Sequence, residues 1–360
     1  MMTKSKLCLS AAFLSAILGL SQAQAADDNV VSVSSWGGTF QDAEREAMFQ
    51  PFEKATGIKV VEGTQPYGTK IRVMVKSGNI EWDAAEVVPA DLFILANEGL
   101  LEPIDYSKFD KDVLASYAKD ALHKYGVGTV TYGRVIAWNT KKYSQATAPK
   151  NWVEFFDVQK FPGRRVLDAG DYTFPPIEYA LLGDGVKPDA LYPLDFERAY
   201  KMLTKIKPFV IKWAKGSSEA PQALVDGEAD LAVVSHSRIA QLKEDGAPVD
   251  FTMNGDLLKR DYWVIPKGTK HYEAAMKFIE FVSRPEQLAA TANKLPVGSP
   301  SSKSFDFINP KRAPQLPTYA ENLKTAIYIS DEWWAETDAK TGMTNRALNV
   351  ELWNKWAISQ

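Results

Sequence analysis

Residues 30–61, VVSVSSWGGTFQDAEREAMFQPFEKATGIKVV, contain the pattern that decides the fold. Val30–Ser34 predicts a short buried strand that ends at Ser35-Trp36-Gly37-Gly38. Gln41–Thr56 predicts an amphipathic helix, because its apolar side chains gather on one face and charged ones, Glu44 among them, on the other. Gly57 ends the helix and Ile58–Val61 resumes as a strand. A strand, a helix and a strand with short turns predict a right-handed crossover between parallel strands.

The same alternation continues towards the end of the first hundred residues. Tyr67–Ser77 predicts a second helix, Trp82–Val88 a third strand, and Asp91–Glu98 a third helix that Gly99 ends. This part of the chain therefore predicts a doubly wound α/β layer.

A second α/β lobe is predicted further along, where strands at Val166–Asp168 and Leu231–Val234 alternate with helices. Tyr262–Pro266 then returns as a strand to the first lobe. Crossings near Tyr132–Asn139 and Asp261–Pro266 predict two doubly wound lobes joined by a two-strand hinge. The expected division is a leader at 1–25, lobe 1 at 26–136, lobe 2 at 137–260, a return to lobe 1 at 261–310, and a helical tail at 311–360 that packs across the lobes.

The first 25 residues predict a secretory signal peptide. Lys4 and Lys6 form a basic start, Leu7–Leu20 an apolar core, and Ala23-Gln24-Ala25 a small-x-small cleavage site. The alternative is a membrane anchor, but the apolar run is short for a span and no stop-transfer pattern follows it. We expect cleavage after Ala25 and export to the periplasm.

The composition of the exported chain excludes several classes of protein. Cys8, the only cysteine, lies in the leader and follows Lys6-Leu7 rather than the small residues that precede a lipidated cysteine. Disulfides, cysteine-ligated metals and cysteine nucleophiles are therefore excluded after cleavage. Without the two leader lysines, 42 − 2 = 40 Lys and Arg stand against 45 Asp and Glu, a net charge of −5. This acidity argues against a nucleic-acid partner, and no other apolar run is long enough to span a membrane.

Several stretches, in their order along nearly the whole exported chain, resemble the solute-binding proteins of binding-cassette (ABC) importers, in the spermidine/putrescine-binding group with the type II periplasmic fold. The stretches are Ser35–Gly38, Phe52–Val60, Trp82-Asp83, Pro89–Asp91, Glu98–Asp105, Ala223–Leu231, Asp261 with Trp263–Pro266, and Phe278–Glu286. The resemblance implies a monomer without cofactor that encloses a small amine by hinge closure and delivers it to an ABC permease in the inner membrane.

The binding residues are predicted from the carboxyl ends of the strands, where open α/β sheets bind ligands. Trp36 is the first candidate, because its indole can cover an ammonium group and the glycines after it let the backbone approach the ligand. The alternative for Trp36 is a core position. The resemblance adds Asp261 as the ammonium partner, with a backbone-binding role in the hinge as its alternative, and it also adds Trp333. The full set of candidates is Trp36, Gly37, Gly38, Thr39, Tyr67, Ala90, Asp91, Asp171, Tyr172, Ser235, His236, Asp261 and Trp333.

Two positions depart from the polyamine-binding pattern. Lys259 and Ser235 stand where that group often has Trp. Fewer stacking aromatics and an added cation suggest a ligand smaller or less positively charged than spermidine. Lys259, Arg260 or Arg238 could pair with a ligand carboxylate, which would favour a γ- or δ-amino acid, although each is more often a solvated surface charge.

Four other functions compete with amine capture. A periplasmic enzyme is disfavoured, since the three histidines are scattered and no nucleophile elbow, HExxH or CxxC occurs. A ferric-ion carrier is disfavoured because no Tyr-Tyr pair occurs, and no other metal site is expected. A binding protein for a sugar or organic anion, or a sensory protein that docks on a receptor, stays open.

Overall fold

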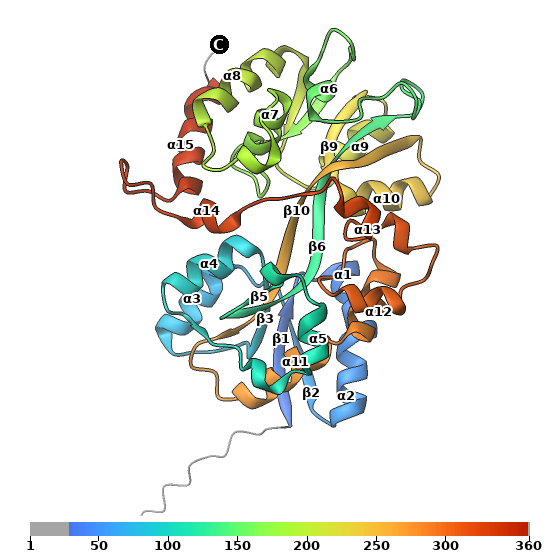
Figure 1. Cartoon of the computed structure of the whole chain (residues 1–360). Helices are drawn as coiled ribbons and strands as arrows, with labels where there is room; N and C mark the ends of the chain where they lie inside the picture. The colour runs from blue at the N-terminus through green and yellow to red at the C-terminus, as the bar shows by residue number, and fades with distance from the viewer. Residues whose placement is uncertain (1–28, 359–360) are drawn as a thin grey trace, which may run out of the picture.

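The computed structural model describes residues 29–358, so the predicted leader lies outside the described part of the chain. Figure 1 shows two α/β lobes, one above the other, with the long strands β6 (Gly126–Asn139) and β10 (Val249–Pro266) running from one to the other. This arrangement confirms the predicted fold class. None of the helices in residues 29–358 is both long and apolar enough to cross a bilayer.

Lobe 1 is built on the crossover predicted from residues 30–61. Strand β1 (Val30–Ser35) pairs in parallel with β2 (Lys59–Thr64) and with β3 (Ala84–Val87). Helices cover both faces of this sheet, and the buried side chains of β1 pack against Phe49, Phe52 and Phe278. The other elements of this lobe are α3 (Gly68–Ser77), α4 (Pro89–Asn97), β4 (Leu101–Glu102), η2 (Tyr106–Lys108), α5 (Lys111–Ser116), η3 (Lys119–Ala121), β5 (Leu122–His123), α11 (Tyr272–Val282) and α12 (Pro285–Lys294).

The helix predicted over Gln41–Thr56 forms in three parts: α1 (Gly38–Glu44), the π-helical segment η1 (Arg45–Phe49) and α2 (Gln50–Thr56). Pro51 lies in the first turn of α2 and has no backbone N–H to donate to the preceding turn, which favours the wider π turn there. The wider turn changes the phase of the helix. Glu44, expected on the charged outer face, is consequently fully buried, and this expectation was wrong.

Lobe 2 has its own parallel strands. Strand β7 (Arg165–Asp168) pairs in parallel with β8 (Val210–Ala214) and with β9 (Leu231–Ser235). The sequence pattern did not predict β8, whose Ile211 and Lys212 are exposed. The helices of this lobe are α6 (Trp152–Phe156), α7 (Ile177–Gly183), η4 (Pro188–Ala190), α8 (Phe196–Ile206), η5 (Lys207–Phe209), α9 (Glu219–Val225) and α10 (His236–Glu244).

The two crossings form one continuous antiparallel pair. Strand β10 follows β6 from Val249 opposite Asn139 to Trp263 opposite Val127, so the main path of the sheet, β2-β1-β3-β10-β6-β9-β7-β8, runs through both lobes. Only its last part, Tyr262–Pro266, was predicted as strand. Polar residues interrupt the apolar pattern before it, and three extra residues of β10 lie between Thr252 and Leu257, which hides the period-2 signal.

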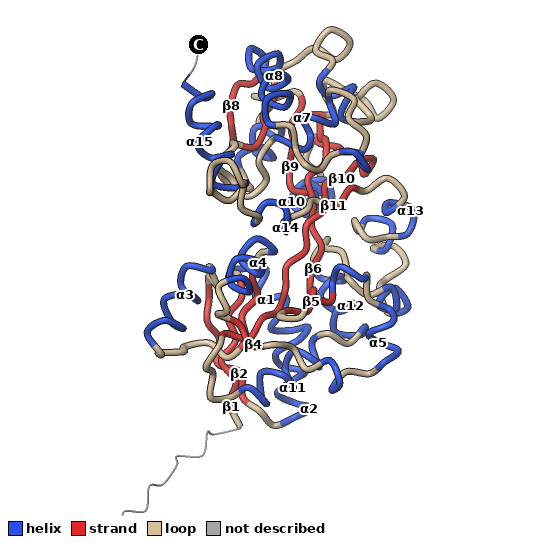
Figure 2. The backbone as a smooth tube through the Cα atoms, turned by 60° about the vertical axis from the view of Figure 1, so that its left-hand side comes forward, coloured by secondary structure: helices blue, strands red, loops and turns tan. Residues whose placement is uncertain are grey.

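The segment after α12 returns to the hinge and then reaches lobe 2. Strand β11 (Ile327–Tyr328) pairs with β10, and α14 (Asp331–Ala335) contacts α4 of lobe 1. Helix α15 (Asn345–Ile358) packs Trp353 against Trp213 of lobe 2, with ring centroids 5.2 Å apart, and Figure 2 shows α14 lying between the lobes. The remaining helices are η6 (Ser302–Asp306), η7 (Ala313–Gln315) and α13 (Ala320–Leu323).

Candidate functional site

Polar side chains from both lobes meet where β6 and β10 pass between the lobes, close to the end of β1. We call this cluster the lobe junction; it contains Trp36, Tyr132, Phe174, Asp261 and Asp331. Near Asp261 the hinge pair is irregular, since β6 advances three residues, from Thr131 to Gly128, while β10 advances two, from Arg260 to Tyr262. Such bulges are common beside functional sites, where they change the direction of a side chain.

Asp261 is a buried carboxylate without a cationic partner. Its side chain accepts a hydrogen bond from the Tyr132 hydroxyl at 2.8 Å, and no lysine, arginine or histidine among residues 29–358 lies within ion-pair distance of it. Burial raises the pKa of Asp261 to about 8, with smaller upward contributions from Asp331 and Glu44. A cation placed beside it would restore the charged form.

Trp36 lies against this carboxylate. Its indole is close enough to lower the pKa of Asp261, yet Nε1 is buried and makes no hydrogen bond of good geometry among the described residues. The ring meets Tyr67 edge to face, with centroids 6.3 Å apart. Gly37 and Gly38 have φ values of 78° and 56°, so the left-handed backbone of this turn is what requires glycine there.

A second acidic group lies behind Trp36. Glu44 and Glu86 are fully buried, and both make a hydrogen bond with the Ser35 hydroxyl, that with Glu86 at 3.0 Å. A hydroxyl has one proton to donate, so at least one carboxyl must donate in return. Burial accordingly raises the pKa of Glu44 to about 8 and that of Glu86 well above its ordinary range. Within residues 29–358, no three His, Cys, Asp or Glu side chains are grouped as a metal site requires.

The lobe 2 side of the junction carries charges that are already paired. Arg134 contacts Asp168 at 3.1 Å and Lys259 contacts Asp331 at 2.7 Å, and all four side chains are at most 5 % exposed. The Phe174 ring lies 4.2 Å from the Arg134 guanidinium and 4.9 Å from the Lys259 ammonium. The two charges within each pair neutralise one another, and Phe174 is left as an apolar surface between the two cations.

Arg346 of α15 is the exception on this side. Its guanidinium donates to the carbonyl of Tyr172 at 2.6 Å and to that of Thr173 at 3.4 Å. No carboxylate of the described residues lies within ion-pair distance, although four act on it electrostatically from further away: Asp331, Glu178, Asp171 and, from lobe 1, Asp91. Burial lowers the pKa of Arg346, but an arginine remains charged. It is therefore a half-buried cation with unused hydrogen-bonding capacity.

Several predicted residues gather around this cluster. Thr39 lies in the first turn of α1, while Ala90 and Asp91 lie in that of α4, where Asp91 accepts a hydrogen bond from the Gly68 N–H at 2.8 Å. The Tyr172 ring lies 5.8 Å from the Arg134 guanidinium. Asp171, by contrast, pairs with Lys215 at 2.6 Å.

Three other predicted residues make contacts with residues that are not members of the junction. His236 is fully buried against Phe251, with ring centroids 5.5 Å apart, and burial lowers its pKa to about 4. The hydroxyl of Ser235 lies 3.1 Å from that of Ser237. The Trp333 ring packs against Tyr192 and Phe196, with centroids 5.6 and 5.8 Å away. Of the three cations considered for a ligand carboxylate, only Lys259 reaches the junction. Arg238 is exposed, and Arg260 contacts Asp120 at 2.7 Å.

Sequence reasoning missed five charged residues of the junction region: Glu44, Glu86, Arg134, Asp331 and Arg346. Two of them had a usable signal, because Glu86 and Arg134 interrupt otherwise apolar strands. A charge at such a position must have a partner or a function. Asp331 lies on a five-residue helix, and Arg346 lies on a helix whose polar and apolar residues are mixed around its surface, so neither charge carries such a signal.

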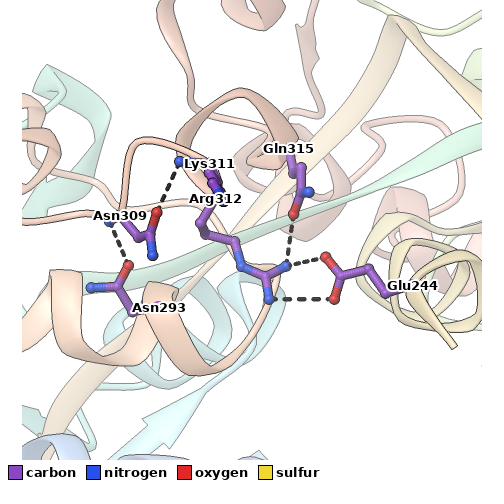
Figure 3. Close-up of a pocket in the computed structure, with 6 residues that line it drawn as sticks. All are labelled: Glu244, Asn293, Asn309, Lys311, Arg312 and Gln315. Atoms are coloured by element: carbon purple, nitrogen blue, oxygen red, sulfur yellow. Dashed lines mark hydrogen bonds and ion pairs between the residues drawn. The ribbon is translucent and has the colours of Figure 1, made fainter.

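A surface depression of about 460 Å³ lies outside the junction. Figure 3 shows Arg312 at its centre, bonded to Glu244 of α10 and to Gln315. Asn293, Asn309 and Lys311 complete its lining. None of these side chains belongs to the junction, and Arg312 serves to tie the segment after α12 to lobe 2.

The comparisons with known proteins agree with the two-lobed fold. The sequence profile of the bacterial extracellular solute-binding protein family matches residues 47–318. The chain is similar to the gamma-aminobutyric acid-binding protein of Pseudomonas aeruginosa, 33 % identical over 89 % of this chain and 90 % of that protein. It is also similar to the spermidine/putrescine-binding periplasmic protein of Escherichia coli, 25 % identical over 87 % and 90 %. The crystal structure of an ABC transporter substrate-binding protein from Bradyrhizobium japonicum matches with a TM-score of 0.82, 32 % identity, and 89 % and 99 % coverage.

Proposed function

The chain belongs to the bacterial extracellular solute-binding protein family, and from that premise we propose that it is the periplasmic component of an ABC importer that captures a small ω-amino acid of about the size of γ-aminobutyrate. The predicted signal peptide supports export, and the partner would be an inner-membrane permease.

The observation that carries this proposal is, within residues 29–358, a buried acid without a cationic partner at the lobe junction and, on the lobe 2 side, a cation without a carboxylate within ion-pair distance. Asp261 is buried without a cation, beside the indole of Trp36. Arg346 is half-buried without a carboxylate, and it lies within electrostatic reach of Asp331. A solute with an ammonium group at one end and a carboxylate at the other would satisfy both, since charge-assisted hydrogen bonds are the strong ones in a desolvated site.

The paired charges leave an apolar surface for the middle of such a solute. Lys259 and Arg134 are neutralised by Asp331 and Asp168, so they act as scaffold and hold Phe174 in place. Phe174 and Trp36 would then cover a short methylene chain. An aromatic face over an ammonium contributes roughly 0.5–2 kcal/mol, depending on desolvation.

Hinge closure would couple binding to delivery. The α4–α14 contact already joins the lobes, and a solute that touches Asp261 and Arg346 together makes both contacts only when the lobes are close. The solute thereby favours the closed form, which the permease would receive. We propose binding without catalysis: the titratable groups of the junction are two carboxylates and the Tyr132 hydroxyl, whose pKa burial raises, and none of the three is an activated nucleophile.

A polyamine is the second candidate, and the buried Glu44 and Glu86 favour it. A diamine could place its second ammonium near these carboxyls. The raised pKa values keep the carboxyls protonated in its absence, and the ammonium would favour their ionised form. Arg346 argues against this solute, because it would face a dication without a carboxylate to bind.

Calorimetric titration of the exported chain with γ-aminobutyrate, putrescine and butyrate tests the proposal. We expect γ-aminobutyrate to bind most tightly, because it alone carries both charges. Asp261→Asn should weaken it by about 1.5–3 kcal/mol, the cost of losing a hydrogen bond to a charged group. Asp245→Asn, at an exposed helix end, is the matched control. Equal affinity in the wild type and in Asp261→Asn, or no binding of either amine, would overturn the proposal.

A further inference from the structure

The hinge strand β10 has a second charged face. Successive side chains of a strand point to opposite sides, so Lys259 and Asp261 reach the lobe junction while Arg260 points the other way. Arg260 there lines a pocket of about 510 Å³ with Tyr117, Ser301, Thr318, Leu323 and Tyr328. We propose that this Arg260 pocket binds a small organic carboxylate with an apolar chain, separately from the transported solute.

The guanidinium of Arg260 is buried and only partly used. Its side chain is 2 % exposed. Nε donates to Thr131 and Nη2 to the Tyr328 hydroxyl, both at 3.2 Å, and one oxygen of Asp120 lies 2.7 Å from Nη1. A guanidinium has five N–H donors in a planar fork, so two remain. Asp120 is 56 % exposed, and water screens the compensation it provides.

The pocket is graded from a polar base to an apolar mouth. Arg260, Ser301 and Thr318 are buried at the base, and the Thr318 hydroxyl makes no hydrogen bond to any described residue. Leu323 and Ala320 are exposed at the mouth. A volume of this size is typical of small-molecule sites, which combine apolar walls with a few placed polar groups.

These features select the class of ligand. A carboxylate matches the free N–H groups of Arg260 bidentately and can accept from Thr318. Tyr117, Leu323 and the other apolar walls would bury a hydrocarbon chain of a few carbons. The ammonium group of the solute proposed for the junction would have no carboxylate partner among the residues that line this pocket, so that solute is not the ligand here.

Titration of the exported chain with hexanoate, alone and with saturating γ-aminobutyrate, tests the inference by calorimetry and by saturation-transfer NMR. We expect one hexanoate site whose affinity is the same in both conditions. Arg260→Gln should raise the Kd at least about tenfold, the scale of one lost charge-assisted bond. Hexylamine, with the same chain and the opposite charge, should not bind.

Matched variants keep the test decisive if Arg260→Gln does not fold. Ala320→Trp, at the exposed mouth, should block hexanoate binding and leave the melting temperature unchanged. Arg238→Gln, on the exposed face of α10, should change neither hexanoate binding nor the melting temperature. The inference is overturned if hexanoate does not bind, if Ala320→Trp binds it as well as the wild type does, or if γ-aminobutyrate displaces it.

Discussion

The two sides of the lobe junction hold their charges in opposite ways. On the lobe 1 side, three buried acids make hydrogen bonds to hydroxyl groups, and burial raises their pKa values, which favours the neutral form; they are Asp261, Glu44 and Glu86. On the lobe 2 side, Arg134 and Lys259 are fully paired with acids. The lobe 1 acids have no cationic partner among the described residues and would bind one, whereas the lobe 2 cations already have acidic partners. We infer that selectivity for the ammonium end belongs to lobe 1 and that rigidity belongs to lobe 2.

Breaking the lobe 2 scaffold should give the largest effect. Asp168→Ala leaves Arg134 buried without its partner, and we expect about 3–5 kcal/mol less free energy of unfolding. Denaturant unfolding measures it. Glu197→Gln, which breaks the exposed pair with Lys201, should cost less than about 1 kcal/mol. Equal losses in the two variants would show that the buried pair is no scaffold.

The pH dependence of binding tests the lobe 1 side. An ammonium group needs ionised Asp261, so affinity should fall about tenfold per unit, about 1.4 kcal/mol, as pH drops below about 8. Calorimetry at pH 6, 7, 8 and 9 measures this slope. A flat profile would mean that Asp261 is already ionised or lies outside the site.

Stability of the solute-free protein should vary with pH in the opposite direction. The folded pKa values of Asp261 and Glu44 lie above the unfolded ones, so the folded state binds more protons between about pH 4 and 8 and loses stability as pH rises. His236 has a lowered pKa and acts oppositely, but only below its unfolded pKa of about 6.5. Melting temperatures should therefore fall from pH 6.5 to 8, and fall less in Asp261→Asn.

Replacing Arg346, the cation on the lobe 2 side of the junction without a carboxylate of the described chain within ion-pair distance, distinguishes the two candidate solutes. Arg346→Gln should weaken γ-aminobutyrate by about 1.5–3 kcal/mol, because the solute carboxylate loses a charged donor. Putrescine should bind the variant at least as well as the wild type. A parallel loss for both solutes would assign Arg346 to the fold rather than to selectivity.

The smallest effect is expected at Trp36. Trp36→Phe keeps an aromatic face but weakens the attraction for an ammonium, so affinity should fall by about 0.5–2 kcal/mol. Competition titration measures it, and Trp82→Phe, in the buried core of lobe 1, serves as a second tryptophan control. Unchanged affinity in Trp36→Phe would place the indole outside the contact surface.

Local patterns in the sequence were enough to predict the two-lobed architecture of this chain and to identify Trp36 as a candidate residue on the lobe 1 side of the junction. Residues 30–61 specify the first crossover by period and turn residues, and the ends of its strands point to Trp36. Asp261 came from resemblance, and its closeness to Trp36 is a result of the fold. Glu44 shows the limit, since one π turn reversed its expected exposure.

Hydrophobic periodicity and glycine positions act over a few residues, and for that reason the sequence alone determined the lobes and the hinge. The partners of buried charges lie far apart along the chain, as Lys259 and Asp331 do, and neither has a local pattern that predicts the other. Strand alternation places Arg260 and its neighbour Asp261 on opposite sides of β10. Only tertiary packing decided which acids stay unpaired, which cations are neutralised, and which side of β10 faces the lobe junction.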